Sequence, residues 1–219
     1  MENFPISQTD AGLHIEGFPD AVKVIQLKGP HAQRLSDLAL HKSDLDVADA
    51  CLDSLNAVPD ESRVVRNALW ESAIVHFSKC FGGSKARFQL SAEKIYKGEP
   101  PEAMIAFNYF KSLRNKHVVH DENAYAQSIP GAVLNKGDKK YKIEKIITLN
   151  TVANTLEQSN FNNLKLLIVK TRTWIDSEFD NLCDTLTREL EEESYEALLA
   201  REPVICRVPT VDEIGKKRK

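Results

Sequence analysis

The sequence has little of several features that define common protein classes. Its 219 residues include only nine glycines and nine prolines, so it lacks the turn-rich composition of a β-sandwich. No apolar run approaches the roughly 20 residues of a membrane span, and we expect no membrane partner. Neither sign of charge dominates, because the net charge is −3, and this excludes a molecule-wide basic field that would attract nucleic acid. Any anion-binding site must therefore be local.

Cysteine is also sparse, and its spacing argues against disulfides and structural zinc. Cys51, Cys80, Cys183 and Cys206 are widely separated and form no C-x-x-C pair. Together with the lack of a recognisable signal peptide, this pattern predicts reduced thiols and a cytoplasmic location. We expect neither a metal nor a cofactor.

The residues that are present, 42% hydrophobic and 28% charged, are typical of a helix-rich globular protein. The length suits one domain of ordinary size. We predict an N-terminal arm at 1–29, broken by proline and glycine, a helical domain at 30–200, and a C-terminal tail at 201–219. The basic end "GKKRK" is interpreted as a solubilising tail, with a nucleic-acid contact as the alternative.

Three helices are predicted before residue 121. The first begins at Pro30 and stops at Pro59, and its buried stripe has alternating three- and four-residue steps. The stripe consists of Leu38, His41, Leu45, Ala48, Leu52 and Leu55. The second runs from an Asp60 cap to Gly82-Gly83 and is apolar over most of its circumference, which predicts a central helix. The third begins at "EPPEA" and reaches about His120.

The hydrophobic period then changes. Residues 126–150 predict a β-hairpin, because "NKGD" supplies a turn and Tyr141, Ile143, Ile147 and Leu149 alternate after it. A long last helix follows from about Ser159 to Ala200, and part of it is expected to project or to pair with another subunit. Its stripe consists of Phe161, Leu164, Ile168, Thr171, Ile175, Phe179, Leu182, Leu186 and Leu190. The predicted fold class is mainly α, with a small hairpin inserted before the last long helix.

The segment "LRNKHVVH" at 113–120 gathers an arginine, an amide, a lysine and two imidazoles. On a helix with about 100° per residue, Arg114, His117 and His120 extend the apolar stripe of the third helix. That stripe consists of Ala106, Phe107, Phe110 and Leu113. Asn115 lies near its edge and Lys111 points elsewhere. The face therefore changes from apolar to cationic over its last two turns.

Three interpretations of this cluster are open. The histidines can be cations at a helix C-terminus, while Arg114 pairs with an acid of a neighbouring helix. A metal site would use His117, His120 and Asp121, but no further ligand pair supports it. A phosphate site would use the arginine fork for charge and a histidine for proton transfer, which are the groups that metal-free RNA cleavage needs.

The run "RNKHVVH", an arginine followed by a polar residue and, after a gap, a histidine, resembles the signature of the HEPN superfamily. It is most similar to the HEPN-type proteins of abortive-infection systems. The resemblance implies a HEPN-like helical bundle that dimerises so that two motifs face each other across a groove. Carried onto this sequence, Arg114 is the motif arginine, Asn115 the adjacent polar residue and His120 the motif histidine. His117 lies inside the gap, and we treat it with Lys111 as a supporting residue.

The function that the resemblance implies is a dimeric, metal-independent endoribonuclease, a toxin or phage-defence effector acting on RNA. A cognate antitoxin would be a further partner. The alternative is a non-catalytic HEPN-like module that binds RNA, a nucleotide or a protein through the same groove. A purely structural adaptor is a third interpretation.

Helix geometry gives an independent reason to expect a dimer. Arg114 and His120 are about 9 Å and 120° apart on an ideal helix, too far to hold one phosphate. A helix that unwinds at Val118-Val119, or a two-fold mate, would bring the groups together. The hairpin lysines Lys136, Lys139, Lys140, Lys142 and Lys145 would then follow the RNA backbone. Alternatively, they only protect a solvated hairpin edge.

Overall fold

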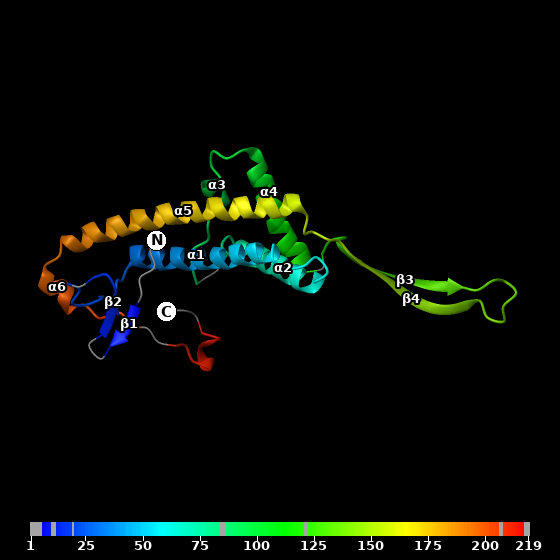
Figure 1. Ribbon diagram of the computed structural model, residues 1–219, viewed down its shortest axis with the longest axis horizontal. Coiled ribbons are helices and arrows are strands. Elements are labelled where there is room, and N and C mark those ends of the chain that lie inside the picture. Colours follow the sequence, from blue (N-terminus) through cyan, green and yellow to red (C-terminus); the bar gives the residue numbers. More distant parts are fainter. Residues whose placement is uncertain are drawn as a thin grey trace. The chain divides into compact units, whose positions relative to one another are not determined.

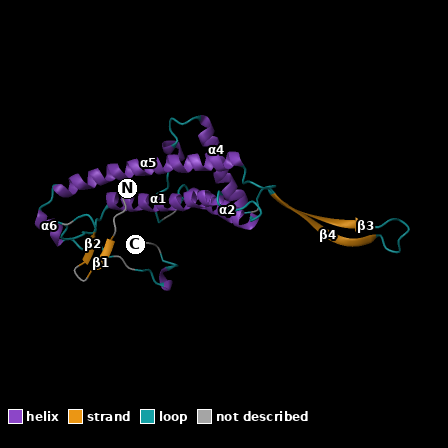
Figure 2. Ribbon diagram, in the orientation of Figure 1, coloured by secondary structure: helices purple, strands orange, loops and turns teal. Residues whose placement is uncertain are grey.

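The computed structural model describes residues 6–9, 12–18, 20–83, 86–120, 122–205 and 208–216. The chain is mainly α-helical, as predicted (Figure 2). Figure 1 labels most of its elements, which are β1 (Ile6–Thr9), β2 (Gly12–Ile15), α1 (Pro30–Leu55), α2 (Arg63–Lys79), α3 (Ala92–Ile95), α4 (Pro101–Leu113), the π-helix η1 (Arg114–Val118), β3 (Ala126–Leu134), β4 (Ile143–Val152), α5 (Gln158–Glu191), α6 (Tyr195–Ala200) and the 3₁₀-helix η2 (Val211–Glu213).

The chain divides into two compact units. Unit 1 comprises Met1–Ser43, Gly82–Leu90 and Thr171–Lys219, and unit 2 comprises Asp44–Phe81 and Ser91–Lys170. Helices α1 and α5 each contribute residues to both units. No helix among the described residues has both the length and the apolar character that crossing a membrane requires.

Unit 1 joins the N-terminal arm to the segment that follows α6. Ile25 forms a β-bridge with Pro203, and the Gln26 N–H donates to the Glu202 carbonyl at 2.7 Å. Lys23 Nζ donates to the Leu199 carbonyl at 2.8 Å. The predicted arm is therefore anchored to the chain's C-terminal region through main-chain hydrogen bonds. Cys206 of the predicted tail lies outside the described residues.

Unit 2 has an aromatic core contributed by α2, α4 and the residues that directly follow α2 and α3. Phe81 and Phe107 meet edge to face with centroids 4.8 Å apart, and Tyr96 contacts the same Phe107 ring at 5.8 Å. Trp70 meets Phe110 at 6.0 Å. These side chains are almost completely buried, so together they form the scaffold from which the end of α4 emerges.

The predicted stripe of the first helix is confirmed. Its six members, Leu38, His41, Leu45, Ala48, Leu52 and Leu55, are each at most 2% exposed. The burial of His41 within an apolar stripe is explained by its ring nitrogen Nε2, which lies 2.8 Å from the Phe88 carbonyl oxygen. The three-and-four-residue periodicity therefore identified the buried face of α1 correctly, including its one polar member.

The prediction for the second helix was wrong at its start. Asp60 does not cap α2, because Ser62 occupies the N-cap position, and the Asp60 carboxylate instead lies 3.4 Å from the guanidinium of Arg66. The helix begins at Arg63 after a turn in which the Ser62 N–H donates to the Pro59 carbonyl at 3.0 Å. Its first turn is also not central, since Val64 is 83% exposed.

The third helix begins with prolines as predicted, but its end differs from the prediction. The α-helix ends at Leu113, and residues 114–118 form the π-helix η1. The Val119 N–H donates to the Arg114 carbonyl at 3.0 Å, a bond between residues five apart. The wider π-turn changes the direction of every side chain after Leu113, so the ideal-helix angles do not apply there.

The hairpin prediction is confirmed, and the last helix is shorter than predicted. β3 and β4 pair antiparallel with Ala126 opposite Val152 (Figure 1). Helix α5 keeps its predicted stripe buried or half-buried but ends at Glu191. A new helix, α6, begins after Ser194, whose hydroxyl accepts a hydrogen bond from the Ala197 N–H at 3.2 Å. This N-cap interrupts the predicted continuous helix.

Candidate functional site

The predicted cluster coincides with the π-turn. Residues Arg114 to Val118 follow directly from the buried end of α4, where Phe110 and Leu113 are 0% and 3% exposed. Helical turns with hydrogen bonds between residues five apart are rare in proteins overall, but those that occur are often found at functional sites. The hydrophobic anchor at Leu113 and the open π-turn after it place the polar side chains at the boundary between the core and solvent.

Arg114 is half-buried and does not pair with an acid among the described residues. Its Nη1 donates to Asn115 Oδ1 at 2.8 Å. A guanidinium bonded to a neutral amide keeps its full positive charge for another anion, whereas a carboxylate would neutralise it. The structure therefore brings Arg114 and Asn115 together and excludes the ion-pair interpretation for Arg114 within the described chain.

His117 lies at the base of the hairpin. Its ring meets the Tyr125 ring edge to face at 5.6 Å, just before β3 begins. Its Nδ1 atom is buried and has no hydrogen-bond partner among the described residues. A buried nitrogen without a partner is costly in a folded protein, so His117 calls for a functional explanation.

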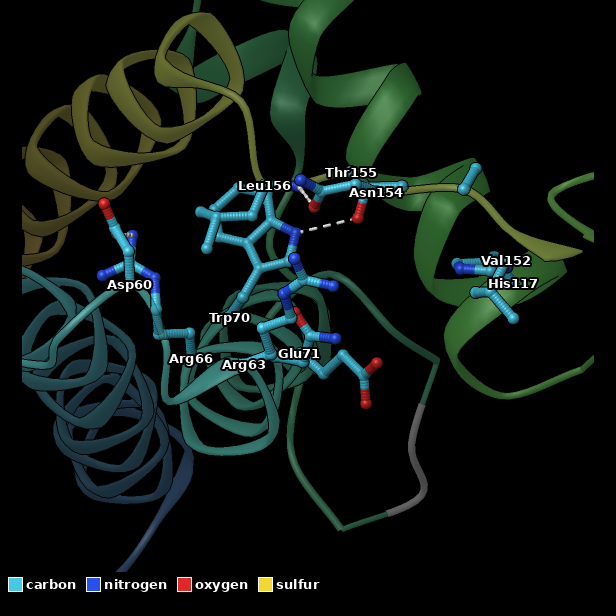
Figure 3. A pocket seen from close by; sticks show the side chains of 12 residues that line it. Asp60, Arg63, Arg66, Trp70, Glu71, His117, Val152, Asn154, Thr155 and Leu156 are labelled. Atoms are coloured by element: carbon cyan, nitrogen blue, oxygen red, sulfur yellow. Dashed lines mark hydrogen bonds and ion pairs between the residues drawn. The ribbon is translucent and has the colours of Figure 1, made fainter.

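His117 faces a polar cavity of about 570 Å³, which we call the hairpin-base pocket. It is lined by Asp60, Arg63, Arg66, Asn67, Trp70, Glu71, His117 and 152–156. In Figure 3, His117 and Val152 lie on one side, Asp60 and Arg66 lie on the opposite side, and Trp70 and Thr155 lie between them.

The two arginines of the pocket have different roles. Arg66 donates to the carbonyls of Leu55 and Val58 at 2.9 and 2.8 Å, so it fixes the connection between α1 and α2. Arg63 is exposed, and its side chain has no hydrogen bond or ion pair within the described ranges. Arg63 is therefore the pocket's available cation.

Hydrogen bonds connect the residues at the floor of the pocket. Trp70, 2% exposed, donates from Nε1 to Thr155 Oγ1 at 3.0 Å. Asn160 donates to the Thr155 carbonyl at 3.0 Å and to the Tyr109 hydroxyl at 3.1 Å. Burial raises the pKa of Tyr109, and the nearby Tyr125 adds to this effect, so the phenol remains protonated.

His120 lies apart from this pocket. It follows the π-turn, is exposed, and lies close enough to Glu122 to lower that carboxyl's pKa. Lys116 is the main cause of the lowered pKa of Glu122, through a short hydrogen bond and its charge. An ionised carboxylate therefore accompanies His120. Asp121, the third residue of the metal interpretation, lies outside the described residues.

The remaining predicted site residues are not brought to the cluster. Lys111 lies near Glu93, whose pKa is lowered first by backbone and Ser91 hydrogen bonds and also by this lysine. The lysines Lys136, Lys139, Lys140 and Lys142 are exposed around the hairpin turn. At about 3.3 Å per residue, the nine residues of β3 separate them from the hairpin base by on the order of 30 Å.

Sequence reasoning missed the hairpin-base pocket. Its cation, Arg63, and its polar rim at 153–155 come from segments that carry no known motif. A weak signal existed, because "NTVANT", which covers the end of the β-branched strand β4 and the residues after it, is rich in amides and hydroxyls. Only the fold shows that this segment meets the start of α2.

No family model, no curated protein and no solved structure matches the chain. The function must therefore be inferred from the chemistry of the site.

Proposed function

We propose that this chain is a metal-independent endoribonuclease of the HEPN type, acting as a dimer and serving as a toxin or phage-defence effector. The observation that carries the proposal is the π-turn, which holds Arg114 half-buried with its guanidinium on the amide of Asn115. A charge held in this way is suited to a phosphate that gains negative charge during cleavage.

Each residue has a defined role in the proposed reaction. His120 acts as the general base and takes the proton of a ribose 2′-OH, the 2′-oxygen attacks phosphorus, and the 5′-oxygen leaves and takes a proton from water. Arg114 stabilises the charge on the phosphoryl oxygens, and Asn115 holds Arg114 in place. The products are a 2′,3′-cyclic phosphate and a 5′-hydroxyl.

The test is cleavage of total RNA in the presence of EDTA. We expect the wild type to cut, and Arg114→Ala and His120→Ala to lose cutting by at least about 100-fold, with melting temperatures within a few degrees of wild type. Lys116→Ala is the matched control, because Lys116 belongs to the same π-turn but is bonded to Glu122. Full activity of both variants would contradict the proposal.

A second candidate function is favoured by the hairpin-base pocket. Its volume of about 570 Å³ lies within the range of small-molecule sites. The pocket presents the cation of Arg63, and the ring of His117 forms part of its lining. A non-catalytic module that binds a nucleotide there would show binding that Arg63→Ala and His117→Ala abolish, with no RNA product in the cleavage gel.

A further inference from the structure

The β3–β4 hairpin has two outer edges, and their hydrogen-bonding groups can be assigned. The Ala153 N–H donates to the Tyr125 carbonyl at 2.7 Å, which makes Tyr125 and Ala153 a hydrogen-bonded pair. Such pairs alternate with non-hydrogen-bonded pairs along an antiparallel ladder. Because Ala126 lies opposite Val152, counting along the ladder makes Pro130 and Thr148 a non-hydrogen-bonded pair. The main-chain groups of both residues therefore face outward.

The outer edge of β3 is blocked and that of β4 is open. Pro130 has no N–H, so it interrupts the outward edge of β3 at its centre. On β4 the outward N–H and C=O groups belong to Ile146, Thr148, Asn150 and Val152. The segment Ile146–Val152 contains no proline, glycine or charged residue, and natural proteins rarely leave such an edge unpaired.

Both faces of the hairpin also carry exposed apolar side chains. Cross-strand partners share a face, so Ile129 and Leu149, at 56% and 59% exposure, lie together on one face. Ile146 and Val152, at 68% and 72%, lie on the other. A two-stranded ribbon is marginally stable in water by itself. A further strand would both complete the edge and cover these side chains.

We propose that a second copy of this chain pairs with this edge, β4 against β4 and antiparallel, around a two-fold axis at Leu149. In this register all four outward residues find partners, since Ile146 meets Val152 and Thr148 meets Asn150. The charge pattern selects the antiparallel arrangement, because it places the two lysine-rich turns at opposite ends of a four-stranded sheet. A parallel arrangement would bring these like charges together.

This pairing would place the lysines of the hairpin turn near the cluster of the other chain. The same register carries the turn of one hairpin past Val152 of the second copy, towards the base where His117 meets Tyr125. Lys139, Lys140 and Lys142, distant from the cluster of their own chain, would then lie beside the cluster of the other chain. This consequence rests on the proposed nuclease function, whereas the pairing itself does not.

The first test is the oligomeric state by light scattering after gel filtration. We expect a wild-type dimer and a monomeric Thr148→Pro variant, because the proline removes an outward N–H and leaves the β3–β4 hydrogen bonds intact. Ser128→Pro makes the same change on the blocked edge of β3 and should remain dimeric. A monomeric wild type, or a dimer that survives Thr148→Pro, would overturn the proposal.

The second test does not weaken the hairpin. At the two-fold axis Leu149 of one copy lies opposite Leu149 of the second copy. Leu149→Cys should therefore give a disulfide-linked dimer on mild oxidation. Ile147→Cys is the control, because its two copies would lie about 13 Å apart, beyond disulfide reach. Wild type, with its native cysteines, sets the background. Equal crosslinking of the two variants would show that the register is wrong.

The third test concerns the lysines. The His120→Ala variant is mixed with a variant in which Lys139, Lys140 and Lys142 are replaced by alanine. Each of the two variants is expected to be inactive or weak by itself. We expect about a quarter of the wild-type rate, since half of randomly mixed dimers contain both chains and each has one complete site. If the wild type cuts RNA but the mixture of the two variants does not, the lysines of one chain do not act on the cluster of the other chain. An inactive wild type would refute the nuclease function, and the first two tests would still decide the pairing.

Discussion

Arg114 donates to a neutral amide, and this hydrogen bond leaves the positive charge of the guanidinium in place. Asn115 accepts at 2.8 Å and contributes no charge of its own, so the half-buried guanidinium has no ion-pair partner among the described residues. Leaving such a charge without a counter-ion has a cost that a bound anion would offset. The choice of amide over carboxylate is therefore the feature that best separates a binding role from a structural one.

Asn115→Asp tests this choice with a nearly isosteric change. The new carboxylate would pair with Arg114 and neutralise it, so we expect RNA cleavage to fall by about 100-fold or more, while the melting temperature stays equal or rises. Asn115→Ala should reduce cleavage less, because the charge of Arg114 remains. Rates from gels and melting by differential scanning fluorimetry measure both effects. Equal activity of the aspartate variant and wild type would contradict the assigned role of Arg114.

Among the secondary-structure elements, the π-turn links the cluster to the core. Five residues occupy a turn that closes with the Val119-to-Arg114 bond. Removing one residue would restore the bonds between residues four apart that an α-helix makes. The side chains after the deletion would then be redirected relative to Arg114.

Deletion of Lys116 is therefore expected to leave the fold intact and to abolish RNA cleavage. Lys116 is exposed and its side-chain and main-chain bonds to Glu122 are both at the surface, so its removal should cost little stability. Lys116→Ala keeps the π-turn and should remain active. Circular dichroism would check the fold, and the EDTA cleavage gel the activity. A deletion variant that cuts RNA normally would show that the π-turn is not needed.

Hydrophobic periodicity predicted the regular elements well and failed where hydrogen bonding is irregular. The stripe of α1 and the hairpin were predictable, because burial and alternation leave a direct pattern in the sequence. The π-turn was not, since nothing in "RNKHV" marks a bond between residues five apart. Arg114, Asn115 and His120 are predicted site residues on the basis of type and spacing, whereas the hairpin-base pocket depends on tertiary contacts between distant segments and could not be predicted.

Within unit 2, Lys165 joins α5 to α1. Its ammonium lies 2.6 Å from Asp49 Oδ1 and 2.6 Å from Asp53 Oδ1. Burial alone would lower the pKa of Lys165, but the hydrogen bonds and charges of the two aspartates raise it above its ordinary value. Because the folded-state pKa is raised, the stabilisation is complete below the ordinary lysine pKa and is lost as the pH rises through the folded value.

Lys165→Met should therefore lower the unfolding free energy by about 0.5–1 kcal/mol at pH 7, a value reduced by the partial exposure of the pair. The difference from wild type should persist to about pH 10 and shrink above it, where Lys165 loses its proton. Urea unfolding at pH 7, 9 and 11 measures this. Lys94→Met, at an exposed position, should show no such difference. A gap between Lys165→Met and wild type that stays constant to pH 11 would contradict the assignment.

For the whole molecule, the main electrostatic fact is a net charge of −3 combined with a local basic turn. RNA would be repelled by the average charge and attracted where lysines gather, so among the described residues the hairpin turn should supply much of any backbone binding. The acidic end of α5 belongs to unit 1 and the lysine turn belongs to unit 2. Binding that depends on so few cations should be highly sensitive to salt.

The salt dependence of RNA binding should therefore change with the lysine count of the turn. Each contact with single-stranded RNA contributes about 0.7 to the slope of log K against log salt concentration. Lys139→Ala with Lys140→Ala should reduce the slope by about 1.4 for any RNA sequence, because phosphate contacts do not read bases. Lys94→Ala with Lys97→Ala removes the same charge from exposed positions near α3 and should leave the slope unchanged. Fluorescence anisotropy at several salt concentrations, with a variant that cannot cleave, measures both slopes. If the two pairs give the same loss, only net charge matters and the turn has no specific role in holding RNA.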